Sequence, residues 1–152
     1  MPRRLILIAL VLSLTLSIVG CGSKRRSPYD PYTVRGKTYY PLRSAEGYSE
    51  VGKAAWYGPG FHGKSTASGE RYNQNAMTCA HRTLPFGTKV RVTNLKNDRS
   101  VVVRVNDRGP FNSKYLIDLS KAAGKELDLI GHGKAKVLVE ALPGQKPRKP
   151  KK

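Results

Sequence analysis

The chain has 152 residues, with 28 Lys or Arg against 10 Asp or Glu, so its formal net charge at pH 7 is +18. Its two cysteines exclude a disulfide-rich scaffold, and its length favours one compact domain over two. The positive charge favours an anionic surrounding: nucleic acid, an anionic surface or an anionic polymer.

The N-terminal segment has the pattern of a secretion signal. Arg3 and Arg4 precede an apolar run over residues 5–19 that has only small interruptions. This run of about 15 residues is shorter than the roughly 20 that a bilayer-spanning helix needs, and it suits a signal peptide. We therefore predict that residues 1–20 are removed and take no part in the fold.

The signal ends in the sequence Ile-Val-Gly-Cys, in which Gly20 precedes Cys21. This sequence resembles a lipobox, which implies that Cys21 is lipidated and anchors the protein to a membrane. The residue after Cys21 is Gly22 and not Asp, which suggests sorting to the outer membrane, facing the periplasm. The alternative is an ordinary signal with a chance cysteine. A secreted lipoprotein does not meet nucleic acid, so we expect membrane headgroups or cell-wall polymers as anionic partners.

Cys79 is the second cysteine, and it has no partner for an intramolecular disulfide once Cys21 carries lipid. We expect Cys79 in a small buried position. His62 and His132 form no recognisable metal-ligand spacing with it. The sequence therefore predicts neither a metal site nor a cofactor.

Residues 21–50 are rich in Ser, Pro, Tyr, Arg and Gly and show no sustained apolar period. We predict a lipidated tether that lies partly on the domain and reaches several nanometres when extended. Its five tyrosines argue against a purely solvated linker, and some are expected to pack on the domain or on a glycan. The Pro- and Lys-rich residues 143–152 predict a disordered basic tail.

Short strand-like runs begin near Val51. Residues 88–93 alternate polar and apolar side chains, Asn97–Asp98 supplies a turn, and residues 100–105 follow, which predicts a hairpin. Residues 134–140 give another alternating strand, and residues 54–57 a short one.

One helix is predicted over residues 120–127, with Asp118 or Ser120 as its N-cap and Gly131 beyond its end. The domain over residues 51–142 is therefore mainly β. Closure into a small barrel would remove exposed strand edges, although periodicity alone does not show closure.

Five loop-like segments combine glycine or small residues with ionisable or aromatic side chains, which is the composition of a functional site. They are Ala55–Gly58, Thr66–Glu70, Ala80–Gly87, Asn106–Phe111 and Ile117–Ser120.

In their order and spacing these segments resemble the rare lipoprotein A family, over about residues 52–142. The resemblance implies a six-stranded double-psi β-barrel with one or two short helices, and it implies lytic transglycosylase activity on cell-wall glycan. Since the barrel also occurs in other proteins, the fold alone does not fix the chemistry. The family's catalytic positions fall here on Glu70, His81 and Asp107.

The implied reaction needs an acid to protonate the leaving oxygen; the same group then takes a proton from the C6 hydroxyl of N-acetylmuramic acid. Asp107 is the candidate for this group. Because an aspartate is mostly ionised at neutral pH, we expect burial or the negative charge of Glu70 to keep it protonated. Arg108 is expected to turn away from Asp107, and His81 to hold a carboxyl group or orient substrate.

Four further residues are assigned to substrate binding, with Tyr57 the preferred aromatic; they are Tyr57, Thr66, Ser68 and Arg108. Taken singly, each candidate has a structural interpretation: Asp107 as a turn former, Glu70 as a solvated loop residue, and His81 as a structural hydrogen bonder.

The resemblance therefore implies an endolytic peptidoglycan lytic transglycosylase that forms 1,6-anhydro-N-acetylmuramic acid ends, and we expect it to be a monomer. The alternative is a non-catalytic peptidoglycan-binding envelope lipoprotein that uses the same surface.

Overall fold

A computed structural model describes residues 27–145 of the chain. The predicted signal, Cys21 and residues 146–152 lie outside this range. The described elements, in chain order, are β1 (Tyr32–Val34), β2 (Lys37–Tyr39), β3 (Ser49–Trp56), β4 (Thr78–His81), β5 (Lys89–Asn94), β6 (Ser100–Asp107), β7 (Ile117–Leu119), α1 (Lys121–Glu126) and β8 (Lys134–Ala141).

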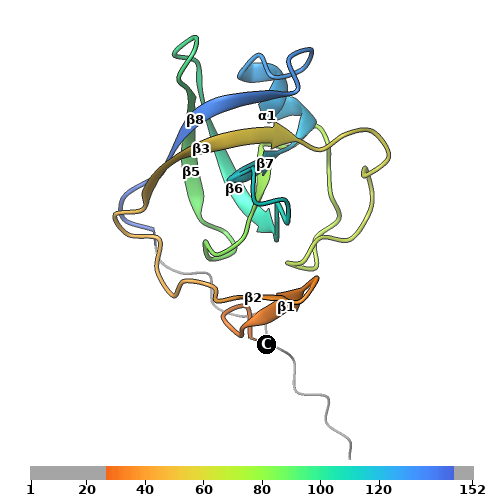
Figure 1. The fold of residues 1–152 in the computed structure, drawn as a ribbon, viewed down its shortest axis with the longest axis vertical. Helices are drawn as coiled ribbons and strands as arrows, with labels where there is room; N and C mark the ends of the chain where they lie inside the picture. The colour runs from red at the N-terminus through yellow and green to blue at the C-terminus, as the bar shows by residue number, and fades with distance from the viewer. Residues whose placement is uncertain (1–26, 146–152) are drawn as a thin grey trace, which may run out of the picture.

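Six of the strands form a closed barrel in the order β3-β7-β4-β6-β5-β8 (Figure 1). The β3–β7 and β4–β6 pairs are parallel, and the other pairs are antiparallel. Closure leaves no sheet edge within the barrel. The fold is mainly β, and the six-stranded double-psi β-barrel that the resemblance implies is confirmed.

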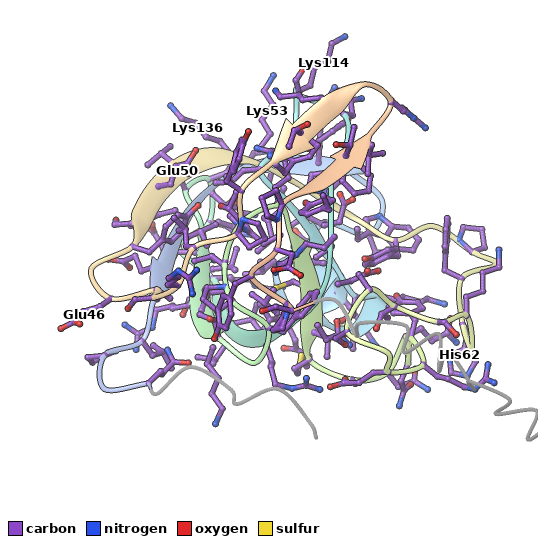
Figure 2. All side chains as sticks on the ribbon, turned by 90° about the horizontal axis from the view of Figure 1, so that it is seen from below. Glu46, Glu50, Lys53, His62, Lys114 and Lys136 are labelled. Atoms are coloured by element: carbon purple, nitrogen blue, oxygen red, sulfur yellow. The ribbon has the colours of Figure 1, made fainter. Side chains whose placement is uncertain are left out.

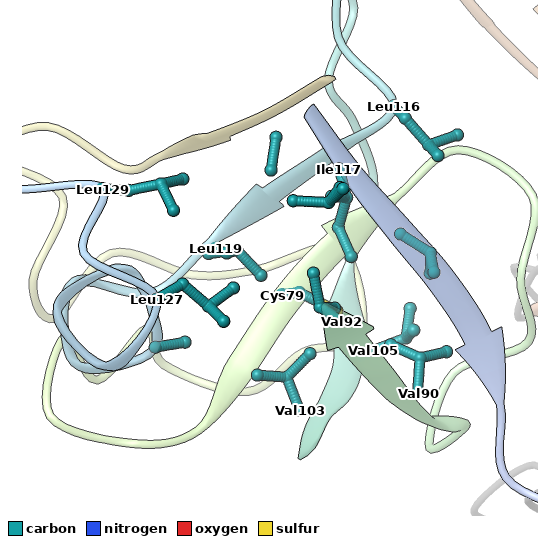
Figure 3. Close-up of a cluster of buried hydrophobic side chains, with 14 of the residues drawn as sticks. Cys79, Val90, Val92, Val103, Val105, Leu116, Ile117, Leu119, Leu127 and Leu129 are labelled. Carbon is teal, nitrogen blue, oxygen red and sulfur yellow. The ribbon is translucent and has the colours of Figure 1, made fainter. Parts of the chain in front are cut away.

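The core consists of inward side chains that alternate with outward ones along β5, β6 and β8. Val90 and Val92 of β5 are fully buried between exposed Lys89 and Arg91. Burying each such valine stabilises the fold by about 1.5–3 kcal/mol. Leu127 and Leu129, which follow α1, pack into the same cluster (Figure 3). Cys79 is also in this cluster, as expected.

The outward positions of the same sheet carry charged side chains. Lys53 of β3 lies directly opposite Lys136 of β8 in the antiparallel register, and both are exposed. Figure 2 shows these two lysines projecting away from the barrel. On this side the two lysines face solvent, while Val137 and Val139 of β8 face the core.

The hairpin and the helix predicted from the sequence are both present. Strands β5 and β6 pair antiparallel, from Lys89 with Arg104 to Thr93 with Ser100. Helix α1 is capped by Ser120, whose side chain accepts a hydrogen bond from the Ala123 amide. Within residues 27–145, no helix is long and apolar enough to span a bilayer.

Residues 27–50, the described part of the predicted tether, contain the β1–β2 hairpin. Tyr32 and Tyr39 are paired across it, with their ring centroids 5.3 Å apart. The Tyr32 hydroxyl donates to the Arg82 carbonyl oxygen at 2.8 Å, and the Leu42 amide donates to the Thr83 carbonyl oxygen at 2.7 Å. The hairpin is thus fastened to the loop after β4, beyond one end of the barrel (Figure 1).

Candidate active site

Asp107, the last residue of β6, is held by three hydrogen-bond donors. Its Oδ1 accepts from the backbone amides of Ala67 and Arg108, each at 2.8 Å, and its Oδ2 accepts from the Tyr57 hydroxyl at 2.8 Å. Burial, together with the nearby Asp107 carboxylate, raises the pKa of Tyr57, so the phenol stays a proton donor. Both oxygens of Asp107 are therefore fixed as acceptors.

The loop containing Thr66 and Ser68 supplies one of these donors. The amide and the hydroxyl of Thr66 both donate to the Glu70 carbonyl oxygen, at 2.8 and 2.9 Å, and the Ser68 amide donates to the Asn106 carbonyl oxygen at 3.3 Å. Gly69 allows the turn because its φ of +84° suits glycine. This folding presents the Ala67 amide to Asp107.

The Glu70 side chain faces β6, where it contacts Arg104 and Asn106. Its two carboxylate oxygens accept from the Arg104 guanidinium at 2.8 and 2.9 Å, and Oε2 also accepts from the Asn106 amide group at 3.2 Å. A bidentate guanidinium–carboxylate pair is the geometrically specific form of an ion pair. Glu70 thus ties the loop to the strand that ends in Asp107, and Arg104 balances its charge.

His81, the last residue of β4, is almost completely buried and contacts backbone amides. Its Nδ1 accepts from the amides of Thr83 and Leu84 at 3.2 and 3.0 Å, so Nε2 carries the proton and donates to the Tyr48 hydroxyl at 2.9 Å. Tyr48 in turn donates to Glu50 at 2.7 Å. Burial and then the charges of Arg82 and Arg108 lower the pKa of His81 to about 3, so the ring is neutral.

The Arg108 side chain turns away from Asp107, which is the orientation expected from the sequence. Its Nη1 donates to the carbonyl oxygens of Leu84 at 2.7 Å and His81 at 3.2 Å, and its guanidinium lies 3.8 Å from the Phe86 ring centroid. Burial lowers the pKa of Arg108 to about 10, which still leaves it charged at neutral pH. Arg108 therefore braces the loop after β4.

Two aromatic side chains pack against the Tyr57 ring. The ring centroids of Tyr57 and Phe61 are 5.7 Å apart, and those of Tyr57 and Tyr72 are 4.7 Å apart. Phe61 is 44% exposed, and the Lys64 ammonium lies 4.9 Å from its centroid. An exposed ring with a cation beside it offers a sugar both a stacking face and a positive charge.

The structure places Asp118 near the candidate site; the sequence reasoning included it in the segment Ile117–Ser120 and as a possible helix cap, but gave it no role in the site. Asp118 occupies the middle of β7, between the buried Ile117 and Leu119. The pKa of Asp118 is raised to about 6, mainly by burial, with the Asp107 carboxylate adding to the shift and Arg82 opposing it. In the sequence, the signal for a role of Asp118 in the site is an ionisable residue between two apolar residues of a strand.

Comparison with known proteins gives two kinds of match. Residues 49–139 match the family described as lytic transglycolase. Proteins named endolytic peptidoglycan transglycosylase RlpA are 58% identical over 112 residues in Campylobacter jejuni and 51% identical over 115 residues in Neisseria meningitidis. These alignments cover 74% and 75% of this chain but 41% and 48% of the relatives, so the chain spans less than half of their length.

Two solved structures share the barrel. The Streptomyces papain inhibitor matches with a TM-score of 0.51 and 24% identity, over 63% of this chain and 96% of the inhibitor. A Clavibacter michiganensis expansin mutant, solved with cellohexaose, matches with a TM-score of 0.52 and 20% identity, over 68% of this chain and 54% of the expansin. At these identities the likeness concerns the fold.

Proposed function

Since this chain belongs to the lytic transglycolase family, we propose that it cleaves peptidoglycan glycan strands endolytically and leaves 1,6-anhydro-N-acetylmuramic acid ends. The observation that carries the proposal is the Asp107 carboxylate, held by three donors, one of which, Tyr57, packs against the exposed ring of Phe61. The names of the relatives that are 51% and 58% identical support the same substrate.

The site residues have different roles in the proposed reaction. Breaking a glycosidic bond develops positive charge on the sugar ring, and a carboxylate fixed in advance stabilises this charge without reorganising during the reaction. We assign Asp107 to this centre, with Tyr57 orienting it. The partly exposed hydroxyl of Ser68 lies on the loop that borders Asp107, where it can contact the glycan. Thr66 is buried and its hydroxyl donates to the Glu70 carbonyl oxygen, so we assign it to holding this loop.

Glu70 and His81 act as positioning residues in this proposal. Glu70 locks the loop onto β6 through Arg104, and His81 holds the turn after β4 through two backbone amides. Arg108 holds the same turn through the carbonyl oxygens of His81 and Leu84, and we propose that the partly exposed part of its side chain contacts the glycan. A neutral, buried imidazole whose nitrogens are both engaged is suited to holding structure.

The products test the function. Purified protein with Cys21→Ala, which needs no detergent, is incubated with isolated sacculi, and the released fragments are analysed by mass spectrometry. Anhydro-ended muropeptides are expected. Ordinary reducing ends would mean hydrolysis, and binding without release would favour a non-catalytic wall-binding protein.

For localisation, we propose that Cys21 carries the lipid and that the protein faces the periplasm from the outer membrane. Acyl chains supply the affinity that holds a folded domain on a bilayer. The Cys21→Ala protein is expected in the soluble periplasmic fraction, while the unchanged protein sediments with membranes. Sedimentation of both proteins would contradict lipidation at this position.

A further inference from the structure

The outer face of strands β3, β8 and β5 is a surface separate from the candidate active site. The antiparallel registers align its side chains in rows across the strands. One row joins Lys53 of β3 to Lys136 of β8, and the next joins Val51 to Leu138. Leu95, whose amide donates to the Lys136 carbonyl oxygen, extends the lysine row past the end of β5. We call this surface the β8 face; it consists of Val51, Lys53, Leu95, Lys134, Lys136 and Leu138.

The lysines of the β8 face have no counter-ion in the protein. Lys53, Lys134 and Lys136 are all exposed, and the only ion pair within residues 27–145 joins Arg104 to Glu70. Like charges directly opposite each other on neighbouring strands destabilise a sheet. The opposed Lys53 and Lys136 therefore lower the stability of the barrel, and an anion outside the protein would offset this cost.

The charges around the β8 face are arranged unevenly. Figure 2 shows Lys114 on the same side of the molecule as Lys53 and Lys136. Glu50 also lies on this side, and its carboxylate accepts from the Tyr48 hydroxyl. Glu140 is two rows away from Lys136, or about 13 Å along β8, where it is in register with Ser49 and Arg91. The lysine end of the face therefore stays positive.

Apolar side chains lie directly beside these lysines. Val51 is 51% exposed and Leu95 is 43% exposed, and the partly exposed Leu138 lies between them. Neighbouring exposed apolar side chains on a folded domain mark a surface that contacts another molecule or a membrane. A hydrated anionic polymer would match the lysines but leave the aliphatic side chains in water. A bilayer interface matches both, because apolar groups enter between the headgroups while ammonium groups contact the phosphates.

The β8 face is on the opposite side of the barrel from β4. In the closed order β3-β7-β4-β6-β5-β8, β4 is three places from β8 in both directions. Strand β4 ends in His81 and pairs with β6, which ends in Asp107. A flat surface against the β8 face therefore leaves the β4 side of the barrel open to a ligand.

We propose that the β8 face docks on an anionic phospholipid surface. The lysines contact lipid phosphates, and Val51, Leb95 and Leu138 lie among the headgroups. This contact goes beyond the proposed function, since it needs neither glycan cleavage nor a lipid on Cys21. It orients the barrel so that its β4 side is directed away from the bilayer.

Vesicle binding by a chain without a lipid tests the contact. Residues 22–152, which include every described residue, are mixed with vesicles of phosphatidylcholine, either alone or with an equal amount of phosphatidylglycerol. Co-sedimentation then measures the bound fraction. Binding is expected only to vesicles with phosphatidylglycerol, and salt should weaken it by screening the charges. A parent protein that does not bind these anionic vesicles at low salt would overturn the proposal.

The first variant removes the opposed lysines. Lys53→Gln combined with Lys136→Gln should weaken vesicle binding by about tenfold or more, since each lysine near an anionic bilayer adds to the affinity. The variant should fold, because the substitution relieves a repulsion between exposed side chains, and thermal unfolding checks this. The matched control, Lys121→Gln with Lys125→Gln, removes the same charge from exposed positions of α1, which packs against β3, β6 and β7. It should bind nearly as the parent does.

The second variant tests the apolar part of the contact. Val51→Thr keeps the shape of the side chain but replaces a methyl group with a hydroxyl, and should weaken vesicle binding by about threefold. Val102→Thr makes the same change at a valine that is 41% exposed on β6, which β5 separates from β8. This control should bind as the parent does.

Three results would overturn docking of the β8 face on lipid. Equal losses for the two lysine pairs would mean an effect of net charge alone, and unchanged binding of Val51→Thr would mean that no apolar side chain enters the interface. Retained vesicle binding with lost binding to isolated sacculi in the Lys53 and Lys136 variant would assign the face to a wall polymer. The vesicles contain no glycan, so these outcomes are independent of the product assay that tests the proposed function.

Discussion

The barrel has two unlike sides. Strands β3, β8 and β5 pair antiparallel, and buried valines alternate with more exposed side chains along β5 and β8, whereas β4 and the end of β6, which lie beside β7, carry buried polar groups such as Thr78, His81 and Asn106. We call these the alternating side and the site side. Functional sites are where local folding rules are broken. The comparison implies that the alternating side stabilises the fold, whereas the buried polar groups of the site side lower the stability and serve the proposed reaction.

The largest expected effect is on the site side. Asp107→Asn keeps an oxygen acceptor for the two amides but removes the negative charge. We expect anhydro-product release to fall by about 1,000-fold or more, with the melting temperature nearly unchanged. Product release measured by mass spectrometry, alongside thermal unfolding, checks both. A large fall in melting temperature would mean that Asp107 mainly supports the fold.

Asp118→Asn should stabilise the fold relative to the parent, and this gain should grow as pH rises. The folded pKa of about 6 lies above the ordinary value of 3.8, so the stability contribution of Asp118 is complete below pH 4 and is lost as pH rises through 6. The Asn variant has no such loss. Relative to the parent it should therefore gain up to about 3 kcal/mol between pH 4 and 7.5.

Urea unfolding of the parent and of Asp118→Asn at both pH values measures this difference. The comparison between the two proteins cancels the contribution of His81, whose lowered pKa makes its own contribution weaken as pH falls below 6.5. A constant difference across the pH range would contradict the raised pKa of Asp118.

On the alternating side, Val92→Ala should affect stability alone. Val92 is fully buried in β5, and removing two methyl groups should cost about 2 kcal/mol through lost burial and a small cavity. Activity per folded molecule should stay at the parent level, measured well below the melting temperature. Lost activity in a fully folded variant would break the comparison.

The smallest effect is expected for Tyr48→Phe, which leaves the His81 Nε2 proton without its acceptor. We expect a loss of about 1–2 kcal/mol of stability and less than a tenfold loss of activity. Urea unfolding and the mass-spectrometric assay measure the two effects. A thousandfold loss of activity in a stable variant would place His81 in the chemistry instead of in positioning.

The alternating side was predictable from the sequence, and the site side much less so. The β5–β6 hairpin, β8 and the Ser120 cap follow from periodicity and capping. Strand β4 has no alternation because all four of its residues are buried, and its parallel partner β6 begins 19 residues after it ends. Such pairing has no local signal.

The β1–β2 hairpin was not predicted, although the sequence carries a local signal for it. Arg35 and Gly36, with φ of 51° and 75°, form a two-residue loop between short β-branched and aromatic runs. The position of Asp107 was predicted from the family resemblance. Its three donors were not, because Tyr57 and Ala67 are 50 and 40 residues away in the chain.

The attachment of the β1–β2 hairpin to the barrel also shortens the predicted tether. If Cys21 carries the lipid, the distance from lipid to folded body is shorter than the roughly 100 Å that residues 21–50 would span when extended, because the Pro28 carbonyl oxygen already accepts from the Arg108 guanidinium at 3.4 Å. Five residues separate Cys21 from Ser27, which limits the distance between these two residues to about 20 Å. Such an enzyme would work on the wall layer nearest the membrane, with its orientation restricted by the hairpin.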